Sequence, residues 1–224
     1  MGAGVARRPG TIVVVTERGR ELDAVDEVDD VDDLARVLGY HGAVDERRGI
    51  SELGPDLVVV PFWTPAFCAA IVRAAELVGY ASDPDDPVPG HEVSLATISP
   101  RLYEAVQDDL GRRIWPQLQQ VWPLIDYHGL RDAFVIRYAV GEQESLRVHH
   151  DVAQVSGSVR LDDDHDGAEL RFPRQGVDNG AVPVGSLLAW PSLVTHPHEA
   201  APLRRGVKHG LTIWCELPFA GLAV

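Results

Sequence analysis

The chain has 224 residues, of which 45% are hydrophobic, and a formal net charge of −14 at pH 7. This length can bury one substantial core, and the acidic surface disfavours binding to nucleic acid or to anionic membranes. No apolar run approaches the roughly 18 residues that span a bilayer, and no cleavage pattern follows the short apolar run at 11–15. We therefore expect a cytoplasmic protein with neither a nucleic-acid nor a membrane partner. Its oligomeric state is left open.

Residues 1–50 differ from the rest and form a predicted acidic extension. Apolar residues recur about every three positions through the aspartate-rich segment 22–38. This spacing is typical of an amphipathic helix, although aspartate is a poor helix former. We expect this extension either to be a solvated appendage of the main domain, residues 51–224, or to serve in docking.

The main domain begins with a predicted strand and helix. The apolar run 57–63 is short, contains a proline and indicates a buried strand. Thr64 then has the character of an N-cap, with Pro65 at the first helical position. Gly79 provides a stop signal, so the predicted helix runs from Pro65 to about Val78.

A second strand and helix are predicted after a loop. Three prolines and three aspartates make residues 82–90 a loop. Alternating apolar residues at 91–98 then predict a strand. Ser99 is a second N-cap, and the helix that it begins is predicted to run toward Val121.

From Ala133 onward the pattern changes to short β-type runs separated by turn residues, including Asn179-Gly180 and Arg205-Gly206. Helices followed by many short antiparallel strands predict a mainly β, α+β domain. The expected architecture is a double-stranded β-helix, a cupin-like jelly roll buttressed by N-terminal helices. The predicted strands are 134–138, 154–161, 168–172, 186–190 and 210–217.

A His-x-Asp pair at His149 and Asp151 is the first sign of a metal site. Successive side chains of an extended segment point to opposite faces, so His149 and Asp151 share a face and His150 takes the other. Two imidazoles and one carboxylate on one face of Fe(II) leave positions for a chelating cosubstrate and oxygen. The pair therefore needs a second, distant histidine.

His196 and His198 both qualify as that histidine, because they also share a face. Lys208 lies ten residues after His198 and twelve after His196. A fixed cation at this distance can hold the far carboxylate of a dicarboxylic cosubstrate. We favour His198 as the ligand and place His196 in an outer-shell or substrate-side position.

These residues resemble the Fe(II)/2-oxoglutarate-dependent dioxygenases of the prolyl and lysyl hydroxylase group, and most of all the procollagen lysyl hydroxylase catalytic domain. The similarity covers roughly residues 57–218 and is strongest from 134 onward. The matching segments, in chain order, are Phe134-Val135-Ile136-Arg137-Tyr138, 142–147, His149-His150-Asp151, Arg171-Phe172 and 193–199, followed by Pro202, Gly206 and Lys208.

The resemblance implies that His149, Asp151 and His198 bind iron and that Lys208 pairs with the distal carboxylate of 2-oxoglutarate. These four residues are the expected catalytic set. A lysine presents a point charge rather than a fork, so a second donor to the cosubstrate is expected. The candidates for that donor are Tyr138, Thr212 and Ser156.

The resemblance also implies a hydroxylation that requires Fe(II), 2-oxoglutarate and O2. Ascorbate is a possible further cofactor. Related halogenases replace the carboxylate ligand by a small residue, so the presence of Asp151 favours hydroxylation or another oxidation. The expected substrate is an amino-acid side chain that is free, peptidyl or carrier-bound, and that is cationic if the acidic turn 162–166 selects it. Collagen itself is not expected, because no secretory signal or extra domain is present.

Two alternative functions remain. One is a tailoring oxygenase that acts on a small-molecule natural product. The other belongs to a different class, a non-catalytic jelly roll that binds or senses metal. That second function would require the loss of one ligand or of the cosubstrate cation, and the sequence retains both.

Overall fold

The computed structural model describes residues 40–45, 47 and 49–217. The predicted acidic extension, with its segments 11–15 and 22–38, lies almost wholly outside these residues. The described part begins with α2 (Tyr40–Ala43), β1 (Ser51–Gly54), β2 (Leu57–Pro61), α3 (Pro65–Val78), β3 (Glu92–Ser94), α4 (Leu95–Ile98), α5 (Pro100–Asp109), the π-helical turn η2 (Leu110–Ile114) and α6 (Trp115–Leu118). It continues with β4 (Leu130–Ala139), β5 (Leu146–His149), β6 (Val155–Arg160), β7 (His165–Gly167), β8 (Leu170–Phe172), β9 (Val177–Asp178), β10 (Ser186–Pro191), the 3₁₀ turn η3 (Leu193–Thr195), β11 (His198–Ala200) and β12 (Leu203–Cys215).

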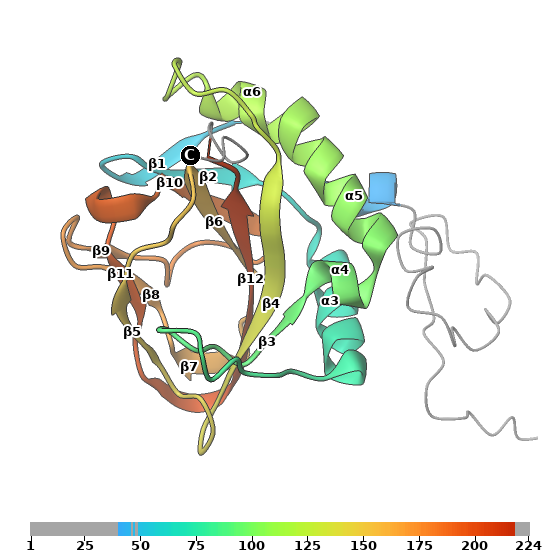
Figure 1. Cartoon of the computed structure of the whole chain (residues 1–224), viewed down its shortest axis with the longest axis vertical. Helices are drawn as coiled ribbons and strands as arrows, with labels where there is room; N and C mark the ends of the chain where they lie inside the picture. The colour runs from blue at the N-terminus through green and yellow to red at the C-terminus, as the bar shows by residue number, and fades with distance from the viewer. Residues whose placement is uncertain (1–39, 46, 48, 218–224) are drawn as a thin grey trace, which may run out of the picture.

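The strands form two antiparallel sheets. The major sheet has the order β1-β2-β10-β6-β12-β4-β3, with β7 also paired to β12, and the minor sheet has the order β5-β11-β8-β9. Figure 1 shows helices α3 to α6 along one side of the molecule, against the major sheet, with the minor sheet on the other side. This arrangement agrees with the predicted helix-buttressed jelly roll.

Successive side chains of β12 point to opposite faces of the sheet, so one strand contributes to both the hydrophobic core and a cavity. Leu211 and Ile213 are fully buried in the cluster that the helices share with the major sheet. Lys208 and Thr212, on the opposite face, line a cavity instead. Each buried aliphatic side chain contributes about 1.5–3 kcal/mol, so helix packing holds β12 in one register and thereby fixes the cavity residues.

Helix α3 confirms the expected boundaries. The side chain of Thr64 accepts a hydrogen bond from the backbone N–H of Phe67 at 3.3 Å, which satisfies one free donor of the first turn. Gly79, at φ 87°, ends the helix. Among the described residues no helix is both long and apolar enough to cross a membrane.

The strand predicted at 91–98 is correct only for its first half. β3 ends at Ser94, whose side chain accepts from the backbone N–H of Ala96 at 3.3 Å and so caps the short helix α4. Leu95 and Ile98, three residues apart, are both buried. The same apolar positions therefore suit a helical turn, and the cap decides between the two structures.

The long helix predicted from Ser99 is present but irregular. The backbone N–H of Trp115 donates to the carbonyl of Leu110, five residues earlier, which widens the helix into η2. Pro116 follows directly and has no N–H to donate. The wider turn shifts the hydrogen-bond pattern before the proline, and the helix ends at Leu118 rather than near Val121.

The expected break at Arg205-Gly206 was wrong. β12 starts at Leu203 and runs through this dipeptide, because Gly206 adopts φ 82° and the pairing with β7 shifts register nearby. The short strands β5 and β11, which carry the two candidate histidine ligands, were also not among the predicted strands.

Gly185 is expected to be essential to stability because its backbone passes very close to Trp63. It has φ 82°, and an added Cβ would lie 2.0 Å from the Trp63 carbonyl oxygen. We expect Gly185→Ala to lower the free energy of unfolding by about 3 kcal/mol or more. The control is Gly141→Ala, at φ 83° with nothing within 4 Å, which should cost only about 1 kcal/mol. Equal losses in urea denaturation would contradict the steric explanation.

Candidate metal centre

Three side chains converge where β5 and β11 lie side by side. One potential ligand atom from each of His149, Asp151 and His198 lies within 4.8 Å of the others. The Nε2 atom of His149 is 3.7 Å from Oδ1 of Asp151, and the Nε2 atom of His198 is 3.7 Å from Oδ2. The carboxylate lies between the two imidazoles, so all three can share one ion. These are the three residues that the sequence predicted as iron ligands.

Strand pairing brings the distant ligands together. His198 on β11 is the direct partner of His149 on β5, and the two ring centroids are 4.4 Å apart. Asp151 follows in the loop after β5, where its carbonyl accepts from the backbone N–H of Leu193 at 3.0 Å. This bond ties the Asp151 loop to η3, which leads into β11.

The imidazoles are oriented for coordination through Nε2. The Nδ1 atom of His149 lies 2.8 Å from the carbonyl of Arg147, and that of His198 lies 3.0 Å from the carbonyl of His196. A carbonyl only accepts hydrogen bonds, so each neutral ring carries its proton on Nδ1 and offers the Nε2 lone pair. Burial lowers the pKa of His198, which favours this neutral form.

The carboxylate completes a donor set that fits Fe(II). The Oδ2 atom of Asp151 is buried and has no hydrogen-bond partner among the described residues. A buried carboxylate oxygen without a donor is costly, and a cation between the three side chains would remove that cost. Two imidazole nitrogens and one carboxylate on one side, with the other side open, is the arrangement of non-haem Fe(II) oxygenases.

The neighbouring histidines take other positions. His196 is buried, with Nδ1 3.0 Å from Oγ1 of Thr195 and Nε2 3.2 Å from the carbonyl of Pro55. Both of its nitrogens therefore have protein partners outside the ligand set. His150 is exposed and lies on the cavity wall. The sequence placed His196 in an outer position, and its bonds show a role in anchoring η3 to the loop at Pro55.

The ligands open onto a cavity of about 490 Å³ between the two sheets. Of the predicted cosubstrate residues, Lys208, Tyr138 and Thr212 line this cavity. Ser156 does not line it: its hydroxyl is fully buried and lies 2.6 Å from that of Ser192. Ser158, two residues further along β6 and directly paired with Thr212, lines the wall instead.

Lys208 is a buried cation in this wall. It is directly paired with Tyr138 on β4, and its Nζ atom lies 5.4 Å from the centroid of that ring. The ammonium donates to the carbonyl of Ala168, and among the described residues no carboxylate forms an ion pair with it. Burial lowers the pKa of Lys208 to about 8. Such a poorly compensated cation is suited to an anionic ligand.

The structure adds wall residues that the sequence patterns did not single out. Asp83, Asp85 and Asp86, in the loop before β3, line the cavity together with Glu92 and Arg131. In the sequence these three aspartates belong to a segment rich in aspartate and proline, and that composition predicts a solvent-exposed loop. They reach the site because β3 pairs with the edge of β4.

The acidic turn at 162–166, proposed to select a cation, is engaged elsewhere. Asp162 contacts His209, and Asp166 forms an ion pair with Arg204 at 2.7 Å. None of the turn lines the main cavity. Selection of a cationic substrate by this turn therefore stays an untested expectation, and three of its carboxylates, those of Asp162, Asp164 and Asp166, already have partners within the fold.

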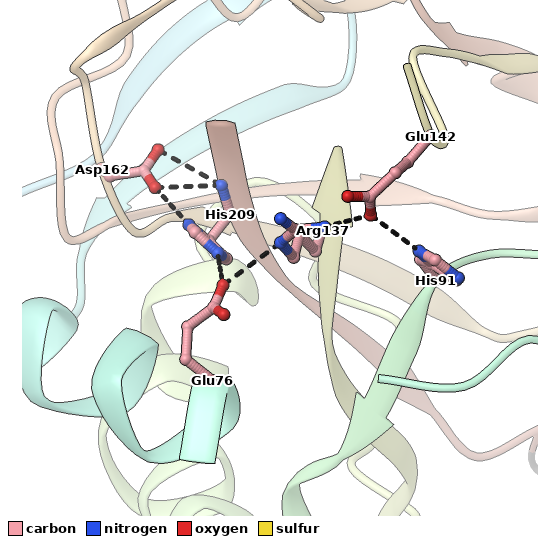
Figure 2. A network of polar contacts seen from close by, with 6 residues as sticks. All are labelled: Glu76, His91, Arg137, Glu142, Asp162 and His209. Carbon is pink, nitrogen blue, oxygen red and sulfur yellow. Dashed lines mark hydrogen bonds and ion pairs between the residues drawn. The ribbon is translucent and has the colours of Figure 1, made fainter. Parts of the chain in front are cut away.

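A polar network supports the opposite face of β4 and β12. Figure 2 shows His209 between two carboxylates, with Nδ1 2.6 Å from Asp162 and Nε2 2.8 Å from Glu76 of α3. Arg137 on β4 continues the network from Glu76 to Glu142. His209 and Arg137 directly follow and precede the cavity residues Lys208 and Tyr138, so the network holds the two strands that carry them.

His209 makes the stability of this region depend on pH. Burial lowers its pKa, but the bonds and charges of Asp162 and Glu76 prevail and raise it above the usual value. The stabilisation is therefore fully present below about pH 6.5 and is lost as pH rises through the raised pKa. We expect His209→Gln to cost about 2 kcal/mol at pH 6 and clearly less at pH 9 in urea denaturation. Exposed His128→Gln is the control, and an equal cost at both pH values would contradict the assignment.

Comparison with known proteins supports the sequence resemblance, although no protein-family model matches the chain. The chain is 28% identical over 184 residues to the multifunctional procollagen lysine hydroxylase and glycosyltransferase LH3 of Rattus norvegicus, which covers 76% of the chain and 25% of the relative. It is also 28% identical over 167 residues to procollagen-lysine,2-oxoglutarate 5-dioxygenase 1 of Mus musculus, covering 69% and 23%. The chain thus spans about a quarter of the length of these relatives.

Solved structures confirm the fold. A viral collagen prolyl hydroxylase from Paramecium bursaria Chlorella virus-1 aligns with a TM-score of 0.55 and 19% identity, covering 73% of this chain and 97% of the other. A prolyl-4-hydroxylase from Pseudomonas putida aligns with a TM-score of 0.50 and 20% identity, covering 84% and 98%. The predicted resemblance to the prolyl and lysyl hydroxylase group is confirmed, as is the double-stranded β-helix.

Proposed function

We propose that this chain is an Fe(II)- and 2-oxoglutarate-dependent oxygenase that hydroxylates an unactivated C–H bond of an amino-acid side chain. The observation that carries the proposal is one cavity whose wall holds His149 and His198 of the minor sheet, Asp151 of the loop after β5, and Lys208 of the major sheet. The likeness to procollagen lysine hydroxylases supports the same class of reaction.

The residues have separable roles in this proposal. The Nε2 atoms of His149 and His198 and the carboxylate of Asp151 would hold Fe(II) and leave its other positions open. Iron, 2-oxoglutarate and O2 together supply the oxidising power that inserts one oxygen atom into the substrate, with succinate and CO2 as co-products. Lys208 would bind the carboxylate of 2-oxoglutarate remote from the metal, and Tyr138 and Thr212 offer hydroxyls in the same wall.

Apolar side chains around His198 keep the centre dry and its ring in place. Trp190 packs edge-on with its ring centroid 5.0 Å from that of His198, and the Phe172 ring lies at 5.5 Å. Both side chains are buried. Packing on two sides limits rotation of the imidazole and excludes water, so His198 keeps Nε2 directed at the ion site.

The proposed substrate group is an amino-acid side chain, free, peptidyl or carrier-bound, with a cationic group favoured by the acidic side chains of the wall. A natural-product tailoring reaction would use the same centre on a different small molecule. The cytoplasmic location is also a proposal. It is supported by Cys68 and Cys215, which are buried free thiols rather than a disulfide.

The proposal is tested by measuring succinate formation from 2-oxoglutarate with purified full-length chain, Fe(II), O2 and ascorbate. We expect Fe(II)-dependent conversion that increases with the correct substrate and a product heavier by one oxygen atom. Amino acids and short peptides are screened first, followed by small natural products. Tight Fe(II) binding without any conversion of 2-oxoglutarate would overturn the proposal and favour a non-catalytic metal-binding domain.

A further inference from the structure

Lys208 lies in a part of β12 that has a turn, rather than a strand, on one side. β12 pairs with β7 up to Gly206 and with β6 from Gly210 onward. The turn 161–164, which joins β6 to β7, therefore passes beside residues 207–209. β4 pairs with the same residues of β12 along their other edge. The position of Lys208 thus depends on the contacts that this turn makes with β12.

Asp162 of the turn takes the place of the missing strand. Its carboxylate accepts hydrogen bonds from the backbone N–H of His209 at 3.0 and 3.2 Å, and it lies 2.6 Å from Nδ1 of the same residue. The backbone N–H of Leu161 donates to the carbonyl of His209 at 3.3 Å. The N–H of His209 belongs to the planar peptide group that joins it to Lys208. Asp162 therefore limits rotation of the backbone directly next to Lys208.

The charge of Asp162 also acts on the Lys208 ammonium. Burial lowers the pKa of Lys208 to about 8, and of the neighbouring charges that of Asp162 has the largest effect, which raises the pKa. Arg160 lowers the pKa and Glu169 raises it, both less strongly than Asp162 acts. The titratable and charged groups around the ammonium are Tyr138 of β4, Arg160 of β6, Asp162, His165 and Asp166 of β7, and Glu169.

The residue type at position 208 gives this influence a consequence. Lys208 is the only lysine in the chain, and the other 19 of its 20 basic residues, lysine and arginine counted together, are arginines. An arginine stays charged when it is buried, whereas a buried lysine can lose its proton near neutral pH. The charge at this position therefore depends on nearby carboxylates in a way that an arginine would not.

We propose that Asp162 is a positioning residue for cosubstrate binding, because its carboxylate both fixes the backbone beside Lys208 and keeps the ammonium charged. Asp162 does not line the main cavity, so it acts through Lys208 and His209 rather than by contact with a ligand. The binding of 2-oxoglutarate by Lys208 rests on the proposed function. The effect of Asp162 on Lys208 does not, and it can be measured in the ligand-free protein.

The first test follows the protonation of Lys208 by NMR. Full-length chain that contains lysine labelled with 13C at Cε gives a single lysine signal, because the sequence has one lysine. We expect a titration midpoint at about pH 8 in the wild type and a midpoint about one pH unit lower in Asp162→Asn. Asparagine keeps an acceptor for the His209 N–H but removes the charge. Asp162→Glu should restore most of the wild-type midpoint.

Asp164→Asn is the matched control. Asp164 belongs to the same turn and forms an ion pair with Arg205 of β12, but its side chain is 98% exposed. The charge of such an exposed group is screened by water, so the Lys208 midpoint should stay at its wild-type value. An unchanged midpoint in folded Asp162→Asn, or an equally large change in Asp164→Asn, would overturn the proposal. Asp162→Ser is a second variant without the charge if Asp162→Asn does not fold.

The second test measures 2-oxoglutarate binding to the Fe(II)-loaded chain without oxygen, by isothermal titration at pH 6 and pH 8. Lowering the midpoint by one pH unit reduces the charged fraction of Lys208 at pH 8 from about one half to about one tenth. Asp162→Asn should therefore weaken binding about fivefold at pH 8 and hardly at pH 6. Asp162→Ala, which also loses the bond to the His209 backbone, should weaken binding at both pH values. The same loss at both pH values in Asp162→Asn would indicate a purely structural role and refute the proposal.

The two tests separate this proposal from the proposed function. A lowered midpoint in Asp162→Asn, without any 2-oxoglutarate binding by the wild type, would retain Asp162 as the residue that keeps Lys208 charged and would refute the proposed function. Fe(II)-dependent conversion of 2-oxoglutarate by the wild type, together with an unchanged midpoint in Asp162→Asn, would leave the proposed function intact and refute the role of Asp162.

Discussion

Replacing His198 by alanine is expected to reduce Fe(II) affinity and succinate formation by at least about 100-fold, because loss of an outer partner of a metal ligand alone typically costs 10–100-fold. His198 supplies one of three ligand atoms that lie within 4.8 Å of one another. Its removal leaves only two ligands, one imidazole and one carboxylate, whereas three are needed to occupy one face of the metal ion. The measurements are Fe(II) binding by titration and succinate by mass spectrometry.

His196→Ala is the matched control, since His196 is equally buried and only two residues away. Its side chain contacts Thr195 and the carbonyl of Pro55 rather than the ligand set. We expect a loss of about 1–3 kcal/mol in the free energy of unfolding, with Fe(II) binding retained. Retained turnover in His198→Ala together with lost Fe(II) binding in His196→Ala would show that the ligand has been assigned to the wrong histidine.

Replacing Lys208 by methionine is expected to raise the KM for 2-oxoglutarate by about 30-fold or more. Methionine keeps most of the buried volume but removes the charge, and losing one partner of a buried charge pair costs about 2 kcal/mol or more, which is about 30-fold at 1.36 kcal/mol per decade. Fe(II) affinity should change little, because Lys208 is not one of the three clustered ligands. Steady-state kinetics at varied 2-oxoglutarate and a separate Fe(II) titration check both expectations.

The wild-type pH profile provides a second measure of Lys208. Burial lowers its pKa to about 8, so the ligand-free protein has mainly the charged ammonium below that pH and mainly the neutral amine above it. The KM for 2-oxoglutarate should be flat below about pH 8 and rise up to tenfold per unit above it. In Lys208→Arg, whose guanidinium remains charged, this rise should disappear. A rise of the same size in the arginine variant would assign the titration to another group.

Local sequence patterns predicted the ends of several elements and the three residues that the structure brings together as candidate metal ligands. Thr64 caps α3 through its own side chain, and Gly79 ends the same helix with a backbone conformation that favours glycine. His149 and Asp151 act together because two-residue spacing places side chains on one face. Each of these features is decided within a few residues of chain, so the sequence alone can specify it.

Errors arose where one local pattern suits two structures. The apolar residues Leu95 and Ile98 fit a strand or a helical turn, and the cap at Ser94 selected the turn. Gly206 marks a turn in isolation, yet β12 continues through it because pairing with β7 accommodates its positive φ. Ser156 shares its face with Ser158, but it is fully buried, contacts Ser192 and does not line the cavity.

The sequence by itself determined which residue types the candidate site contains, namely two imidazoles, a carboxylate and a following cation. Only the tertiary structure decided that His198 rather than His196 meets His149, because strand pairing across 49 residues sets that register. It also decided which carboxylates remain available: Asp162 is engaged by His209, whereas Glu92 faces the cavity without a partner. Ion pairs between distant segments leave no local pattern, so the fold had to be known before the partners of these carboxylates could be inferred.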